Sequence, residues 1–95
     1  MLILESRAYE KKVEKLIKGN YLLKSKIDKA KDLLLIDPFC IPLKTHKVIT
    51  VKNAEKYSSY VTGNLRIIWR FEKDNNTIIF LVTIGGHSGK DKVYK

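Results

Sequence analysis

The sequence predicts an α+β domain whose N-terminal half is helical and whose C-terminal half is rich in strands. Apolar residues recur at helical spacing as far as residue 36, and after residue 56 the hydrophobic pattern has a period of two. Helices followed by strands are typical of folds in which helices cover one face of a sheet. We therefore expect one domain, residues 1–95, with an N-terminal strand and a two-helix hairpin packed on one face of a mostly antiparallel sheet of about four strands.

The first half of the chain begins with LILES (residues 2–6), which favours a strand, and Ser6 can cap a following helix. Gly19-Asn20 is a helix stop signal, and Asp37-Pro38 ends the second helix because the residue before proline avoids helical angles. Each helix has one apolar face, formed by Tyr9, Val13, Leu16 and Ile17 in the first and by Leu23, Ile27, Ala30, Leu33 and Leu34 in the second.

The second half of the chain begins with a loop that Pro38 and Pro42 fix, followed by VITV (residues 48–51) as a short strand candidate. Three stronger candidates follow: YSSYV, LRIIWRFEK and TIIFLVTIG. The connections TGN and KDNN contain the Gly, Asn and Asp residues that turns favour.

The charge of the chain is strongly positive, with 19 basic and 10 acidic residues, a net charge of +9. Such a surface attracts polyanions, and nucleic acid or an acidic protein is the expected partner, against the alternative of a merely soluble lysine-rich surface. A single cysteine excludes an internal disulfide and favours a reducing cytoplasm. The N-terminal apolar run is too short for a signal peptide or a membrane span.

Two arginines lie on one face of the strand LRIIWRF. Successive side chains of a strand point to opposite faces of the sheet, so Arg66 and Arg70 should lie on one face. The other face is apolar and should pack against the helices; it carries Leu65, Ile67, Trp69 and Phe71. The planar guanidinium group of arginine presents N–H donors that fit two oxygens of a phosphate. The alternative is that these arginines are solvated or paired with Glu72 or Asp74, and for Arg70 the two interpretations are equally supported.

Two further groups of polar residues are candidates for function. His87 follows two glycines, which would let a ligand come close, and Tyr94 lies between Lys92 and Lys95, where an aromatic ring can stack on RNA bases. Tyr94 could instead close the edge of the core. The PLKTHKV loop adds Lys44, His46 and Lys47, and the ligand spacing of the histidines and the cysteine argues against a metal site.

These segments together resemble the RelE/ParE toxin superfamily of type II toxin–antitoxin modules, over nearly the whole chain. The resemblance is carried by LESRAYEKKVEKLIKG, by DP after the second helix, by PLKTHKV, and most specifically by GNLRIIWR followed by IGGHS and VY. His46 and His87 make the pattern most similar to the YafQ-type branch.

The resemblance implies a RelE-like fold and a ribosome-dependent mRNA endonuclease that uses neither metal nor cofactor. Arg66 would clamp the phosphate, His87 would be the general acid, His46 would be the loop histidine and Tyr94 would stack on a base. Lys44 and Lys47 would share in charge stabilisation, and Arg70, Lys90 and Lys92 would add RNA contacts. The general base stays open, because YSSYVT contains no Lys, His or Arg.

The expected partners are an acidic antitoxin, with a toxin–antitoxin heterotetramer as one candidate assembly, and the ribosome with its mRNA. Two alternatives remain open at this point: a ParE-like inhibitor of DNA gyrase, and a non-catalytic RNA- or protein-binding member of the same fold. The combination of His46, Arg66, His87 and Tyr94 favours the nuclease over the gyrase inhibitor.

Overall fold

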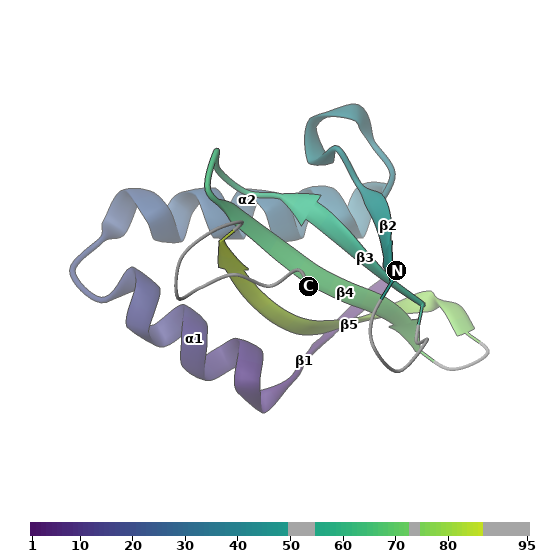
Figure 1. Ribbon diagram of the computed structural model, residues 1–95, viewed down its shortest axis with the longest axis horizontal. Helices are drawn as coiled ribbons and strands as arrows, with labels where there is room; N and C mark the ends of the chain where they lie inside the picture. The colour runs from purple at the N-terminus through teal and green to yellow at the C-terminus, as the bar shows by residue number, and fades with distance from the viewer. Residues whose placement is uncertain (50–54, 73–74, 87–95) are drawn as a thin grey trace.

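The computed structural model describes residues 1–49, 55–72 and 75–86. The predicted α+β class, the N-terminal strand and the two-helix hairpin are confirmed (Figure 1). The elements in chain order are β1 (Leu2–Glu5), α1 (Arg7–Ile17), α2 (Tyr21–Ile36), the short 3-10 helix η1 (Ile41–Leu43), β2 (His46–Ile49), β3 (Glu55–Tyr60), β4 (Leu65–Glu72) and β5 (Asn75–Gly86).

The sheet contains five strands in the order β1-β5-β4-β3-β2, one more than the sequence predicts. β1 runs parallel to β5, and the other neighbours are antiparallel. The additional strand is β2, which begins before VITV and pairs His46 with Ser58 and Lys47 with Tyr57. The assignment of His46 and Lys47 to a loop is therefore wrong. Pro42, which has no N–H for a ladder, already lies within η1, so the chain after it is able to pair.

The helix ends follow the predicted signals. The Ser6 hydroxyl accepts a hydrogen bond from the Tyr9 N–H at 3.0 Å and donates to the Val82 carbonyl at 2.7 Å, so one side chain caps α1 and joins it to β5. Gly19 takes the left-handed conformation at φ 70° after α1, and Asn20 then caps α2. The two helices thus follow each other through one tight turn (Figure 1).

The core lies between the two helices and one face of the sheet. Tyr9 of α1 is buried there, and burial, with the charges of Glu5 and Asp28 adding to it, raises the pKa of its hydroxyl above the ordinary value. The Tyr9 hydroxyl has no hydrogen-bond partner among the described residues. The other buried members of the core are Ile27, Ala30, Leu34, Leu43, Val61, Leu65, Ile67, Trp69, Ile79, Leu81 and Ile84.

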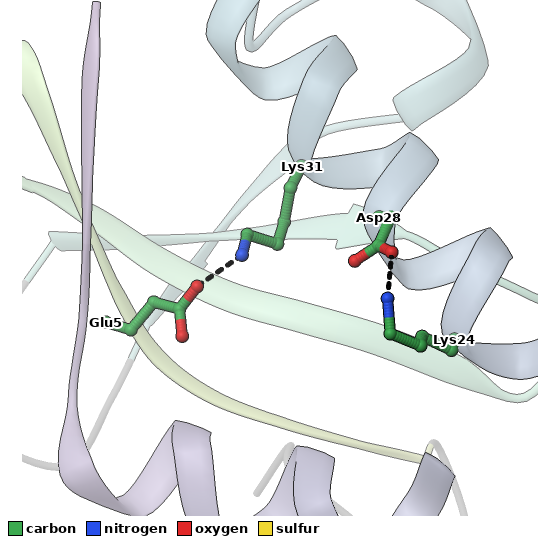
Figure 2. A network of polar contacts seen from close by, with 4 residues as sticks. All are labelled: Glu5, Lys24, Asp28 and Lys31. Carbon is green, nitrogen blue, oxygen red and sulfur yellow. Dashed lines mark hydrogen bonds and ion pairs between the residues drawn. The ribbon is translucent and has the colours of Figure 1, made fainter.

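An ion pair joins α2 to the edge of the sheet. Lys31 of α2 donates to the carboxylate of Glu5 at the end of β1, and Figure 2 shows this contact beside the pair that Lys24 forms with Asp28 along the helix, at 2.8 Å. The Lys31–Glu5 pair is partly shielded from solvent, and it links β1 to α2 across 26 residues of sequence. None of the described helices is long and apolar enough to cross a membrane.

Candidate functional site

The face of the sheet opposite the helices carries the candidate site. The predicted alternation on β4 is confirmed, because Leu65, Ile67 and Trp69 belong to the core and Phe71 packs against it. Arg66 and Arg70 therefore project from the other face, where both are partly exposed. We call this the open face of the sheet, since both helices pack on the opposite side.

Arg66 is held in place by its own strand and by the preceding turn. Its Nη1 donates to the carbonyl oxygen of Thr62 at 2.6 Å and to that of Leu65 at 3.1 Å. Its guanidinium carbon lies 4.8 Å from the centre of the Tyr60 ring, on the residue paired with it in β3. Among the described residues only Nη1 forms hydrogen bonds, so within that part of the chain the edge formed by Nε and Nη2 retains donors that suit two oxygens of a phosphate.

His46 lies on the same face as Arg66, with one strand between them. It is paired with Ser58, two residues before Tyr60 on β3, while Tyr60 is paired with Arg66. The Nδ1 atom of His46 lies 3.3 Å from the carbonyl oxygen of Lys44. A carbonyl only accepts hydrogen bonds, so His46 donates in this contact when Nδ1 carries a hydrogen.

Lys44, which precedes β2, and Lys47, which lies within it, are on different sides of the sheet. Lys44 follows η1 in the left-handed conformation, and its Nζ lies 5.1 Å from the centre of the Tyr60 ring on the open face. Lys47 is paired with Tyr57, a residue that packs against the core, and it forms an ion pair with Glu55 at 3.0 Å. The hydrogen bond and the charge of Glu55 raise the pKa of Lys47. The structure thus brings Lys44 to Arg66 and His46, and it directs Lys47 away from them.

Arg70 shares the open face with Arg66 and pairs with Glu72 at 2.9 Å, which is one of the two alternatives that the sequence leaves open. Its guanidinium carbon also lies 4.6 Å from the centre of the Phe80 ring, on the paired residue of β5. Its charge is therefore partly balanced, in contrast to that of Arg66, whose described hydrogen bonds go only to carbonyl oxygens.

The remaining predicted residues, His87, Lys90, Lys92 and Tyr94, lie outside the described residues. The last described residues of β5 are the two glycines that precede His87, and they pair with the start of β4, Gly85 with Arg66 and Gly86 with Leu65. A Cβ atom on Gly86 would lie 3.1 Å from both the backbone oxygen and the Oδ1 of Asn64. Glycine therefore fits position 86 because the turn between β3 and β4 comes too close to leave room for a side chain.

A chain of hydroxyl hydrogen bonds, buried at Ser59 and half-buried at Thr45, supports the segment that joins Lys44 to His46 at the start of β2. The Trp69 Nε1 donates to the Ser59 hydroxyl at 2.8 Å, the hydroxyls of Ser59 and Thr45 lie 2.6 Å apart, and Thr45 donates to the Pro38 carbonyl at 2.6 Å. Thr45 has one hydroxyl hydrogen and gives it to Pro38, so Ser59 must be the donor to Thr45. This hydroxyl chain fixes Thr45, the residue between Lys44 and His46.

Sequence reasoning missed Tyr60, which contacts both Lys44 and Arg66. A groove of about 330 Å³ lies beside it, lined on one side by Lys26, Lys29 and Leu33 of α2. The only signal in the sequence is the spacing of Tyr60 from Arg66 across the TGN turn, and this spacing identifies the pair only once the hairpin register is known.

No protein-family model matches the chain, and no curated protein sequence matches it. Solved structures of toxins do match it over almost its full length. A metal-bound toxin from Helicobacter pylori has a TM-score of 0.73 at 23% identity, covering 92% of this chain and 94% of that one. A YoeB/ParE toxin from Agrobacterium tumefaciens has a TM-score of 0.75 at 15% identity, covering 93% and 100%. YafQ in the Escherichia coli DinJ–YafQ complex has a TM-score of 0.69 at 18% identity, covering 90% and 91%.

These similarities confirm the predicted RelE/ParE-like, YafQ-like fold. At least two of the similar structures, both of Helicobacter pylori toxins, hold a metal, but among residues 1–49, 55–72 and 75–86 of this chain no group of three His, Cys, Asp or Glu side chains could hold a metal ion. What the described site offers chemically is positive charge from Arg66 and Lys44, a titratable ring at His46 and an aromatic face at Tyr60.

Proposed function

We propose that the chain is the toxin of a type II toxin–antitoxin module and acts as a ribosome-dependent mRNA endonuclease. The observation that carries this proposal is the arrangement of Arg66, Lys44 and His46 on one open face of a toxin-like fold. A nuclease needs a positive site for the phosphate and a group that transfers protons, and these residue types meet both needs.

The proposed reaction is attack of the ribose 2′-oxygen on the adjacent phosphorus. The 2′-hydroxyl loses its proton, the new P–O bond closes a 2′,3′-cyclic phosphate, and the 5′-oxygen leaves with a proton. Arg66 stabilises the negative charge that builds on the phosphate, through the donors that its bonds to Thr62 and Leu65 leave over. His87 is the proposed general acid, His46 assists proton transfer, and Tyr94 is the proposed base-stacking residue.

The proposed partner in the cell is an acidic antitoxin that covers the open face. YafQ, which has a similar fold, was solved in complex with DinJ. A chain with a net charge of +9 has the opposite charge to such a partner, whose binding segment would fold on the toxin. We propose a cytoplasmic complex, with the heterotetramer as the assembly to test by its mass in solution. Co-purification without loss of nuclease activity would contradict a partner that blocks the site.

Expression of the chain tests the proposed function against its alternatives. We expect loss of intact mRNA and arrest of translation while DNA supercoiling stays unchanged. Loss of supercoiling with intact mRNA would indicate a gyrase inhibitor instead. Translation, mRNA and supercoiling that all stay unchanged would indicate a non-catalytic binding module.

Replacement of Arg66 by lysine tests the phosphate clamp. Lysine keeps the charge but loses the planar fork, so Arg66→Lys should cleave at least about tenfold more slowly. Arg7→Lys is the matched control, because Arg7 is exposed at the start of α1 and lies away from the open face. Equal cleavage rates for Arg66→Lys and the parent would remove Arg66 from the proposed mechanism.

A further inference from the structure

Tyr60 lies between two cations that arrive from opposite sides of its strand. Arg66 is its paired residue on β4, with the guanidinium carbon 4.8 Å from the ring centre. Lys44 comes from the side of β2, with Nζ 5.1 Å from the same centre. Lys44 lies two residues before His46, the first residue of β2, and Tyr60 lies two residues after Ser58, the partner of His46, so both lie at the same end of the β2–β3 pair. One ring thus contacts both Lys44 and Arg66.

The backbone at Lys44 supports a role for its side chain. Lys44 has φ 46° and ψ 41°, and it is the only non-glycine residue with positive φ in the described part of the chain. Glycine or asparagine fits this left-handed conformation with less strain, so a lysine is not selected here by the turn itself. Its N–H donates to the Ile41 carbonyl at 3.0 Å, which fixes the backbone of Lys44 at the end of η1, and its Nζ lies 5.1 Å from the centre of the Tyr60 ring.

Lys44 and Arg66 each have a second contact besides the Tyr60 ring, a hydrogen bond to a backbone carbonyl. A cation over an aromatic face is attracted by the negative charge of that face, most strongly where solvent is partly excluded, and Tyr60 is half-buried. Arg66 is fixed through Nη1 on the one side, and Lys44 is fixed by its backbone on the other. The ring sets the position of each charge relative to the other.

We propose that Tyr60 is a positioning residue, whose ring holds Lys44 and Arg66 at the spacing needed to contact the sugar–phosphate backbone of a single RNA strand at two points. This inference rests on the proposed function and adds to it the residue that organises the site. The aromatic face carries the role, and the hydroxyl does not take part. Lys44 thereby becomes the second cation of the site, next to Arg66.

Three variants test this proposal in two assays, single-turnover cleavage of ribosome-bound mRNA and equilibrium binding of a single-stranded RNA oligonucleotide at several salt concentrations. Tyr60→Phe keeps the ring and should stay within about threefold of the parent in both. Tyr60→Leu removes the ring and should lose about 5- to 30-fold in RNA affinity, the effect of two cation–π contacts. Its salt dependence should also become shallower, which a purely structural defect would not produce.

Lys44→Gly keeps the proposal testable if Tyr60→Leu does not fold. Glycine relieves the left-handed strain, so thermal stability should be unchanged or higher. The slope of log RNA affinity against log salt concentration should become shallower by about 0.7, which is the contribution of one phosphate contact to a single strand. Equal damage in Tyr60→Phe and Tyr60→Leu would overturn the proposal, as would RNA binding by Tyr60→Leu within twofold of the parent. If the parent binds RNA but does not cleave it, the nuclease function fails, while the binding series still tests Tyr60.

Discussion

Ser59 is a small buried residue whose replacement should have a large effect on stability. Its hydroxyl is fully buried, accepts from the Trp69 Nε1 at 2.8 Å and donates to Thr45. In Ser59→Ala the indole N–H has no acceptor, which costs about 1–3 kcal/mol, and the bond to Thr45 is lost at about 1 kcal/mol. We expect a loss of about 2–4 kcal/mol in the free energy of unfolding.

For a domain of this size that loss lowers the melting temperature by roughly 10–30 °C. Thermal and urea denaturation followed by circular dichroism measure it directly. Ser25→Ala is the matched control, because Ser25 is exposed on α2, where alanine favours the helix, and its stability should stay within about 0.5 kcal/mol of the parent.

A double-mutant cycle with Trp69→Phe isolates the cause. Phenylalanine has no N–H, so in that background Ser59→Ala leaves no indole donor unpaired and should cost only about 1 kcal/mol. If Ser59→Ala costs the same in both backgrounds, the indole N–H is not the reason for the loss. A loss below 0.5 kcal/mol in the parent background would refute the reasoning altogether.

Three further predictions concern the core, the turn between β3 and β4, and salt. Tyr9→Phe should be neutral or stabilising at pH 7, because the Tyr9 hydroxyl has no hydrogen-bond partner among the described residues. In the parent, the free energy of unfolding should fall as pH rises past about 10, because the unfolded chain loses the phenol proton that the folded chain keeps. Denaturation of both proteins at several pH values checks this. Gly86→Ala should cost about 1–3 kcal/mol by its contact with Asn64, whereas Gly63→Ala, with open space around it, should not destabilise the fold. The logarithm of the RNA association constant should fall linearly with the logarithm of the salt concentration, and an association constant that does not change with salt would exclude phosphate contacts.

The helical half of the fold is predictable because its signals are local. The period of Tyr9 and Val13, the stop at Gly19 and the proline after Asp37 each act within a few residues, and the structure confirms all of them. The bounds of β2 were not predictable in the same way. HKVI has no clear alternation, and its pairing with β3 depends on partners about ten residues away in the chain.

The candidate site was predictable where it depends on alternation along one strand, and not where it depends on register between strands. Arg66 and Arg70 lie on the face that a period of two assigns to them. The contacts of Tyr60 with Lys44 and Arg66 join three segments of the chain, and the close approach of Asn64 to Gly86 joins two. The hydrophobic pattern of a single strand does not indicate contacts between distant segments, because these contacts depend on the register of the strands in the sheet.

Single-turnover cleavage of ribosome-bound mRNA by the purified chain is the decisive measurement of the proposed nuclease activity. We expect that the parent cuts the message, and that His87→Ala loses about 10²- to 10⁴-fold of the rate, the contribution of a general acid. Arg66→Ala should lose about 10²- to 10³-fold, while Arg7→Ala, exposed at the start of α1, should cut like the parent. Absence of cleavage by the parent, or cleavage by Arg66→Ala within a few-fold of it, would contradict a nuclease built on the open face of this sheet.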